Sequence, residues 1–267
     1  MTSTNRRRGD RPESRLVRAS TFAILAVLAM VGAAPAAQAQ TAESRGFLTV
    51  NGGILAAGAD LAARGTFGGP LFGPEDASFE ADHRAATDIL FDVGGGVRVW
   101  RNLAVGASVS RASRKTDVAV SGQLPHPFHF DRQRRVSGTA RGLARTETAL
   151  HLHAQYLIPV SSSFTVTLSA GPTRFNVTQD LVMRLDFEQE YPYDSASFAG
   201  ASTQHQSAST FGVHVGADAA FYVSSAIGVG ATVRFSRGTV DFEAPGGGAN
   251  ESTAGGLETS GGLRIRF

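Results

Sequence analysis

The 267-residue sequence contains no cysteine, a single lysine and no apolar run long enough for a membrane-spanning helix. Without cysteine the chain forms neither disulfides nor thiolate metal sites. The longest apolar run, residues 19–31, falls short of the roughly 20 residues that a helix needs to cross a bilayer. Six arginines and two acids lie in the first 18 residues, and the rest of the chain has 19 basic and 21 acidic side chains. This balance offers no basic face for a nucleic acid.

The N-terminal region has the order of a secretory signal peptide. An Arg-rich stretch precedes the apolar run, and the small-residue tripeptide AQA follows it at residues 37–39, as at a cleavage site. We expect residues 1–39 to be a cleaved signal peptide and residues 40–267 to form one exported domain. The alternative, an uncleaved N-terminal anchor, is disfavoured by the short apolar run.

From residue 45 onward, apolar side chains alternate with small or polar ones. A period of two predicts β-strands that have one apolar and one polar face. Eight such segments can be recognised, and we expect each to form a strand of about 10–12 residues. This is the length that a tilted membrane-spanning strand needs. They are residues 46–57, 89–100, 103–109, 149–158, 164–170, 211–221, 227–236 and 257–267.

The connections between these segments alternate in length. Short turns are expected at 101–102, 159–163 and 223–226. Long loops rich in Gly, Pro, Ser and charge are expected at 58–86, 116–145, 177–208 and 241–255. Short turns at one end and long loops at the other are typical of outer-membrane barrels, and this arrangement places both termini on the periplasmic side.

The polar face of the strands favours a membrane barrel over the alternative, a soluble lipocalin-like barrel. It carries mainly Gly, Ala, Ser, Thr and His, which suit the cramped lumen of eight strands. Its few charges have both signs and need partners in a low-dielectric lumen, so we predict that they pair across it. The predicted polar network of the lumen comprises Asp92, Arg98, His151, His153, His214, Asp218, Arg234, Glu258, Arg264 and Arg266.

The chain ends in the strand GGLRIRF, in which Leu263, Ile265 and Phe267 alternate with polar residues. Together with the signal peptide and the long alternate loops, this resembles the small outer-membrane β-barrel superfamily, which includes the OmpA membrane domain, OmpX and OmpW. The resemblance implies an all-β fold, an eight-stranded antiparallel up-and-down transmembrane barrel. It also implies that the barrel-assembly machinery recognises the three alternating residues as an assembly signal. We expect a monomer in the outer membrane.

Two groups of residues raise the question of chemistry. Arginine binds phosphate in a bidentate manner, so a basic cluster in the second long loop is a candidate contact for lipopolysaccharide: Arg132, Arg134, Arg135 and Arg141. The acidic, aromatic third loop could pair with this cluster across the rim. The His126–His129 pair is a weak metal pattern, and no nucleophile motif accompanies the inward histidines. We therefore expect no catalytic residue, metal or cofactor.

These features predict an integral outer-membrane barrel with a structural or surface-interaction role carried by its long loops. We expect outer-membrane lipid and lipopolysaccharide as partners, and no enzymatic activity. Two alternatives remain. One is a narrow channel or carrier for small or hydrophobic molecules, and the other is a lipid A-modifying enzyme that uses the inward histidines.

Overall fold

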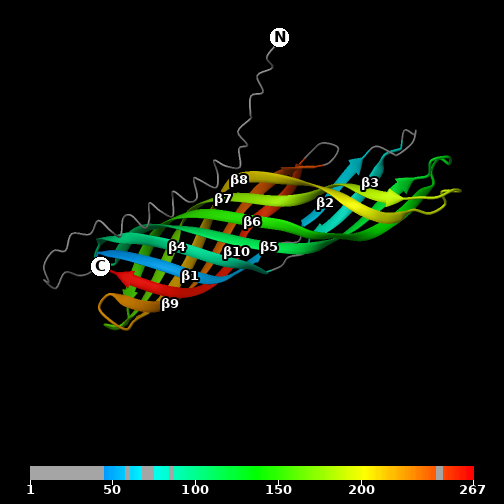
Figure 1. The fold of residues 1–267 in the computed structure, drawn as a ribbon. Helices are drawn as coiled ribbons and strands as arrows, with labels where there is room; N and C mark the ends of the chain where they lie inside the picture. Colours follow the sequence, from blue (N-terminus) through cyan, green and yellow to red (C-terminus); the bar gives the residue numbers. More distant parts are fainter. Residues whose placement is uncertain (1–44, 58–60, 68–74, 84–86, 245–248) are drawn as a thin grey trace, which may run out of the picture. The chain divides into compact units, whose positions relative to one another are not determined.

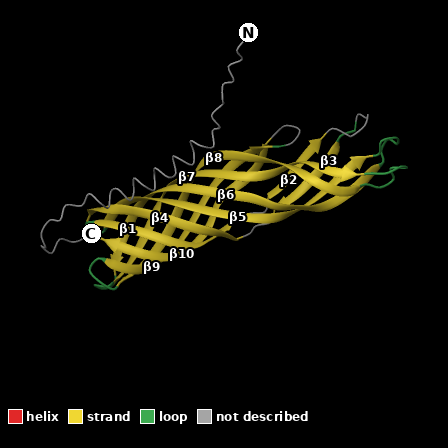
Figure 2. Cartoon of the chain, in the orientation of Figure 1, coloured by secondary structure: helices red, strands yellow, loops and turns green. Residues whose placement is uncertain are grey.

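The computed structural model describes residues 45–57, 61–67, 75–83, 87–244 and 249–267, and these form ten antiparallel strands without helices (Figures 1 and 2). None of the described segments is a helix of the length and apolarity that crossing a bilayer requires. The predicted signal peptide, residues 1–39, lies outside the described residues. The strands are β1 (Gly46–Ala57), β2 (Leu61–Phe67), β3 (Ala77–His83), β4 (Thr87–Trp100), β5 (Leu103–Pro125), β6 (Gln133–Pro159), β7 (Phe164–Glu188), β8 (Ser197–Tyr222), β9 (Ile227–Glu243) and β10 (Ala249–Arg266).

Eight of these strands close into a barrel. The ring runs β1, β4, β5, β6, β7, β8, β9 and β10, every neighbour is antiparallel, and β10 returns to pair with β1. The other two strands form a β2–β3 hairpin within the segment 58–86 that was expected to be a loop, and β3 pairs with β5. The predicted eight-stranded antiparallel barrel is confirmed.

The first and last strands close the ring at the chain's C-terminus. The amide of Gly46 donates to the carbonyl oxygen of Phe267 (2.8 Å), and the Phe267 amide donates to the Gly46 carbonyl oxygen (2.9 Å). The sequence left the facing of this first strand open, and the structure places Val50 and Ile54 outward and buries Asn51 in the lumen. The short turns lie at the same end as Phe267, since the Arg266 amide donates to Ala226 in the turn after β8. We call this the short-turn end and the opposite one the far end.

An apolar belt surrounds the barrel next to the short-turn end. Outward side chains such as Phe91, Phe211 and Val213 are exposed to the surroundings of the barrel. One position beyond the belt, the outward residue becomes arginine on three alternate strands, and Arg111 lies beside Phe91. An apolar ring of this kind suits a lipid surrounding, and Arg111 lies at its far edge, level with Phe91.

The strands do not end at the edge of the belt. Strands β5 to β8 have 23, 27, 25 and 26 residues, so most of 116–145 and 177–208 is strand and the prediction of long loops there was wrong. Beyond the belt the outward face contacts no lipid, so polar residues replace the apolar ones and the sequence contrast weakens. A β-bulge at residues 141–142 of β6, opposite residues 116–118 of β5, also reverses the parity of β6, which hides the continuous strand in the sequence pattern.

The extension beyond the belt has two layers with a core of its own. Pairing between β6 and β7 stops at Arg145, after which β6 stays with β5 and β7 stays with β8. Side chains from both layers meet in an apolar cluster that includes Phe79, Val118 and Leu185, and Phe198 packs against it. A Cβ atom on Gly138 of β6 would overlap the ring of Phe198 of β8. The layers therefore approach closely, and the extension is a packed β-structure rather than a set of loops.

Candidate functional site

Arginine–carboxylate pairs cross the lumen inside the apolar belt. Arg234 of β9 donates from Nη1 and Nη2 to Oδ2 of Asp92 (both 3.2 Å) and from Nη1 to Oε2 of Glu258 (3.2 Å). The side chains of Arg234, Asp92 and Glu258 are only 6%, 2% and 6% exposed. On the same level, Arg264 of β10 donates from Nε to both carboxylate oxygens of Asp218 (3.2 and 3.1 Å). These five inward charges pair with one another across the lumen.

Asn51 of β1 joins the two ion pairs, a role that was not predicted from the residue pattern. Its Nδ2 donates to Oδ1 of Asp92 (2.9 Å), and its Oδ1 accepts from Nη1 of Arg264. Gly230 of β9 makes room for this arrangement, because a Cβ there would press on the Arg264 guanidinium. Asn51 escaped notice because the facing of the first strand could not be decided from its residues.

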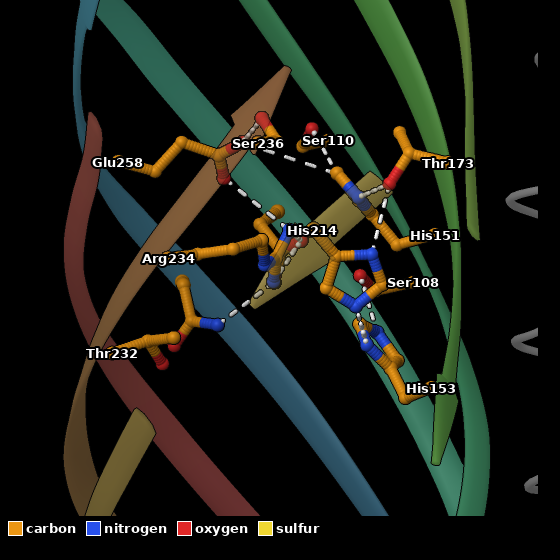
Figure 3. A network of polar contacts seen from close by, with 12 residues as sticks. Ser108, Ser110, His151, His153, Thr173, His214, Thr232, Arg234, Ser236 and Glu258 are labelled. Atoms are coloured by element: carbon orange, nitrogen blue, oxygen red, sulfur yellow. Dashed lines mark hydrogen bonds and ion pairs between the residues drawn. The ribbon is translucent and has the colours of Figure 1, made fainter. Parts of the chain in front are cut away.

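The three inward histidines form one continuous hydrogen-bonded chain with hydroxyl groups (Figure 3). Its five contacts are 3.1, 2.9, 2.8, 2.9 and 3.0 Å long. In order, the chain runs Ser110, His151, Thr173, His214, His153 and Ser108. A neutral imidazole donates from one nitrogen and accepts at the other, so neutral rings satisfy every link in either direction.

This arrangement does not have the geometry of a catalytic triad. Ser110 and Glu258 both approach Nε2 of His151, at 3.1 and 3.9 Å, while Nδ1 is bonded to Thr173. In a triad the acid and the nucleophile engage opposite nitrogens of the ring. His151 is also fully buried. Among the residues that the structure describes, no group of three or more histidine or acidic side chains is placed to hold a metal ion. The contacts match the satisfied polar network that the sequence favoured over an acid–base relay.

Two members of the predicted network lie at the short-turn mouth instead. Arg98 and Arg266 line a cavity there. Nε of Arg266 donates to the carbonyl oxygen of Ser225 (2.7 Å), and its guanidinium lies 3.9 Å above the ring of Tyr222. For Arg266 the expected pairing with a lumen carboxylate is therefore wrong, because its position on the last residues of β10 places it beside the neighbouring turn.

Toward the far end, apolar side chains fill the lumen above the polar network. Phe175 and Leu90 are fully buried there, and Phe175 belongs to a cluster contributed by β6, β7, β9 and β10. A second polar group follows, in which Arg145 donates to Gln179 (2.8 Å) and Glu147 accepts from the Gly255 amide (2.8 Å). Sequence reasoning missed this group because it assigned residue 145 and its surroundings to the boundary of a loop. These two layers lie above the polar network in the lumen.

The four arginines proposed as lipopolysaccharide contacts lie in different environments. Arg135 and Arg141 are exposed on the outer face of β6. Arg132 pairs with Asp194 of the acidic segment (2.9 Å). Arg134 is only 4% exposed and donates to Gln189 (2.7 Å) and to the carbonyl oxygen of Pro125 (2.8 Å). Arg134 is thus a structural cross-link, because the parity of β6 turns it inward.

We call the joined ends of the β5–β6 and β7–β8 hairpins the far-end tip. Three aromatic side chains there are exposed: Phe128 by 68%, Phe130 by 71% and Tyr191 by 84%. His126 lies beneath them, and its Nδ1 accepts from the Phe128 amide (3.1 Å). Burial, together with the positive charges of neighbouring histidine and arginine residues, lowers the pKa of His126 below its ordinary value of 6.5.

A closed ring of eight antiparallel strands, an outward apolar belt and a polar, filled lumen define a transmembrane β-barrel of the small outer-membrane class. No protein-family model matches the chain, and comparison with curated proteins gives no significant match. Among solved structures, Neisserial surface protein A (NspA) aligns with 83% of this chain and 97% of its own at 14% identity and a TM-score of 0.43.

Two further structures are similar to the same extent. The outer membrane protease OmpT from Escherichia coli aligns with 88% of this chain and 100% of its own, at 11% identity and a TM-score of 0.43. Outer membrane protein OprG from Pseudomonas aeruginosa aligns with 84% of this chain and 97% of its own, at 12% identity and a TM-score of 0.43. These identities and scores assign no activity to the chain.

Proposed function

We propose that this integral outer-membrane protein has a structural and surface-interaction role, with a lumen closed to solutes and the far-end tip as its working surface. In this proposal the short-turn end faces the periplasm, together with the start of β1 and the C-terminus. The barrel-assembly machinery reads Leu263, Ile265 and Phe267 during biogenesis, and the folded protein is a monomer without enzymatic activity.

The observation that carries this proposal is the exposed aromatic cluster of the far-end tip. Aromatic side chains are enriched at the centres of protein interfaces, where they contribute much of the binding energy. Phe128, Phe130 and Tyr191 stand on hairpins that are cross-linked by Arg134 and by the Arg132–Asp194 ion pair. The cross-links hold the aromatic rings before a partner arrives, which lowers the entropy lost on binding.

The charged row at the far edge of the belt supports lipopolysaccharide as a lipid partner. Arg111, Arg174 and Arg237 point outward on β5, β7 and β9, one position beyond the apolar side chains. At that height they would meet the phosphates of the outer leaflet, with Arg135 and Arg141 further out. Bidentate arginine–phosphate contacts would then fix the depth of the barrel in the membrane.

The first test measures ion conductance of the purified barrel in planar bilayers. The filled lumen predicts no steady openings, whereas steady openings in the wild-type protein would favour the channel or carrier alternative. A variant that carries Phe175→Ala and Leu90→Ala removes two fully buried side chains of the apolar layer and serves as a positive control for a loosened lumen.

The alternative of a lipid A-modifying enzyme is tested by mass spectrometry of lipid A after overexpression. We expect the lipid A to be unchanged.

The second test concerns the tip. Bacteria that display the wild-type protein are compared on arrays of immobilised extracellular proteins and glycans with bacteria that display a Phe128→Ser, Phe130→Ser, Tyr191→Ser variant. A matched control carries Ser121→Ala, Ser137→Ala and Thr139→Ala, which change exposed residues of the extension away from the tip. We expect barrel-dependent binding to be lost in the first variant and kept in the control. Binding that survives in the tip variant would refute the assignment of the working surface.

A further inference from the structure

The short-turn half of the lumen holds a cavity that the polar network does not fill. Its volume is about 110 Å³, and side chains from all eight strands of the ring line it. The ion pairs of Arg234 and Arg264 form its inner wall, and Arg45, Arg98 and Arg266 line it as well. The cavity lies outside the far-end tip and takes no part in the function proposed above.

Positive charge exceeds negative charge around this cavity. Five arginines line it, and among its described lining residues the only carboxylates are Asp92 and Asp218. Glu258, which pairs with Arg234, adds a third negative charge. Five positive against three negative charges leave a net charge of +2 around a cavity that opens at the short-turn mouth, where Arg45 is exposed. A concave site with an excess of positive charge attracts ligands of negative charge.

The walls also present hydrogen-bond donors that the protein itself does not use. Gln155, Thr167 and Ser169 line the cavity, and within the described part of the chain their side chains have no hydrogen-bond partner. Both carboxylates are already engaged: Asp92 by Asn51 and Arg234, and Asp218 by Arg264. The remaining capacity of the cavity is therefore for a group that accepts hydrogen bonds and carries negative charge.

We infer that this cavity binds a dianionic phosphate group, as free phosphate or as a small phosphate monoester. A dianion matches the net charge of +2, guanidinium groups pair with phosphate oxygens in a bidentate manner, and the hydroxyl and amide side chains can donate to the remaining oxygens. One water molecule occupies about 10–15 Å³ of a cavity volume measured in this way, so a cavity of about 110 Å³ holds several waters. It therefore has room for a single tetrahedral oxyanion but not for a large solute.

The test is calorimetric titration of the full barrel in a maltoside detergent, whose headgroup contains no phosphate, with inorganic phosphate and separately with glycerol phosphate. Arg98→Gln and Arg45→Gln each remove one charge from the cavity lining, and each should weaken binding about tenfold, the effect of losing one charge-assisted hydrogen bond. Arg184→Gln, which removes the same charge from an exposed position of β7 in the extension, should leave the affinity unchanged. Heat-modifiable migration confirms that each variant is folded.

Saturable binding of both ligands would support the inference and admit a monoester, whereas saturable binding of inorganic phosphate alone would support the free anion. Absence of saturable heat with both ligands would overturn the inference, as would an equal loss of affinity in Arg184→Gln. Should Arg98→Gln fail to fold, Arg45→Gln still decides the question, because Arg45 is exposed and precedes β1.

Discussion

Arg234→Met tests whether the ion pairs hold the lumen together. Arg234 bridges Asp92 and Glu258 across the barrel, and all three side chains are at most 6% exposed. Methionine fills similar space but leaves two buried carboxylates facing each other without a cation. Removing one member of a buried ion pair costs about 3–5 kcal/mol, because an uncompensated charge remains. Since Arg234 serves two carboxylates, we expect a loss near the upper end, about 4–5 kcal/mol.

The measurement is unfolding of the barrel by urea in detergent. The folded fraction at each urea concentration is read from heat-modifiable migration on a gel. With a urea dependence of about 2 kcal/mol per molar, the expected loss shifts the midpoint by about 2 M. A compensated variant, Asp92→Asn with Arg234→Met and Glu258→Gln, should lose only about 1–2 kcal/mol because no buried charge is left unpaired. Arg237→Met on the outer surface should change stability by at most about 0.5 kcal/mol.

Two results would refute the reasoning about the lumen. One is an Arg234→Met variant no less stable than Arg237→Met, which would mean that water reaches the carboxylates. The other is a compensated variant as unstable as Arg234→Met, since the loss would then come from packing rather than from charge. Acidification should also restore part of the stability of Arg234→Met, because protonation neutralises the two buried carboxylates that the variant leaves without a cation.

Three further predictions concern the extension, the tip and the closing strand. Gly138→Val should destabilise the extension by about 1–3 kcal/mol through overpacking against Phe198; hydrogen exchange should rise in β6 and β8 beyond the belt but not within it, and an unchanged profile would contradict the two-layer packing. Because the pKa of His126 lies below 6.5, its contribution to tip stability is present above about pH 6.5 and is lost as the pH falls through the native pKa; the protection factor of the Phe128 amide should drop between about pH 7.5 and about pH 5, and a constant factor would show that His126 does not control the tip. Deleting Phe267, which pairs with Gly46, should lower the amount of assembled barrel in isolated outer membranes more than it changes tip binding; normal insertion would refute an assembly role for this residue.

Much of the barrel is determined by the sequence alone. A period of two assigns each residue of a strand to one face, so eight segments and the inward position of residues such as Asp92, Arg234 and His214 follow from local order. The need of buried charges for partners then predicts pairing across the lumen. The structure confirms these points, because lipid on one side and a narrow lumen on the other impose a strong contrast on adjacent residues.

Only the tertiary structure decides which residues meet and where the strands end. The register between strands sets Arg264 against Asp218 and brings Asn51 between the two ion pairs. Alternation within one strand excludes a slip by one residue but leaves a slip by two residues open. Beyond the belt the outward face meets no lipid and a bulge reverses the parity, so the sequence reads as loop although the chain continues as strand. The inward turn of Arg134 has the same origin: its side follows from packing between two hairpins that are far apart in the sequence.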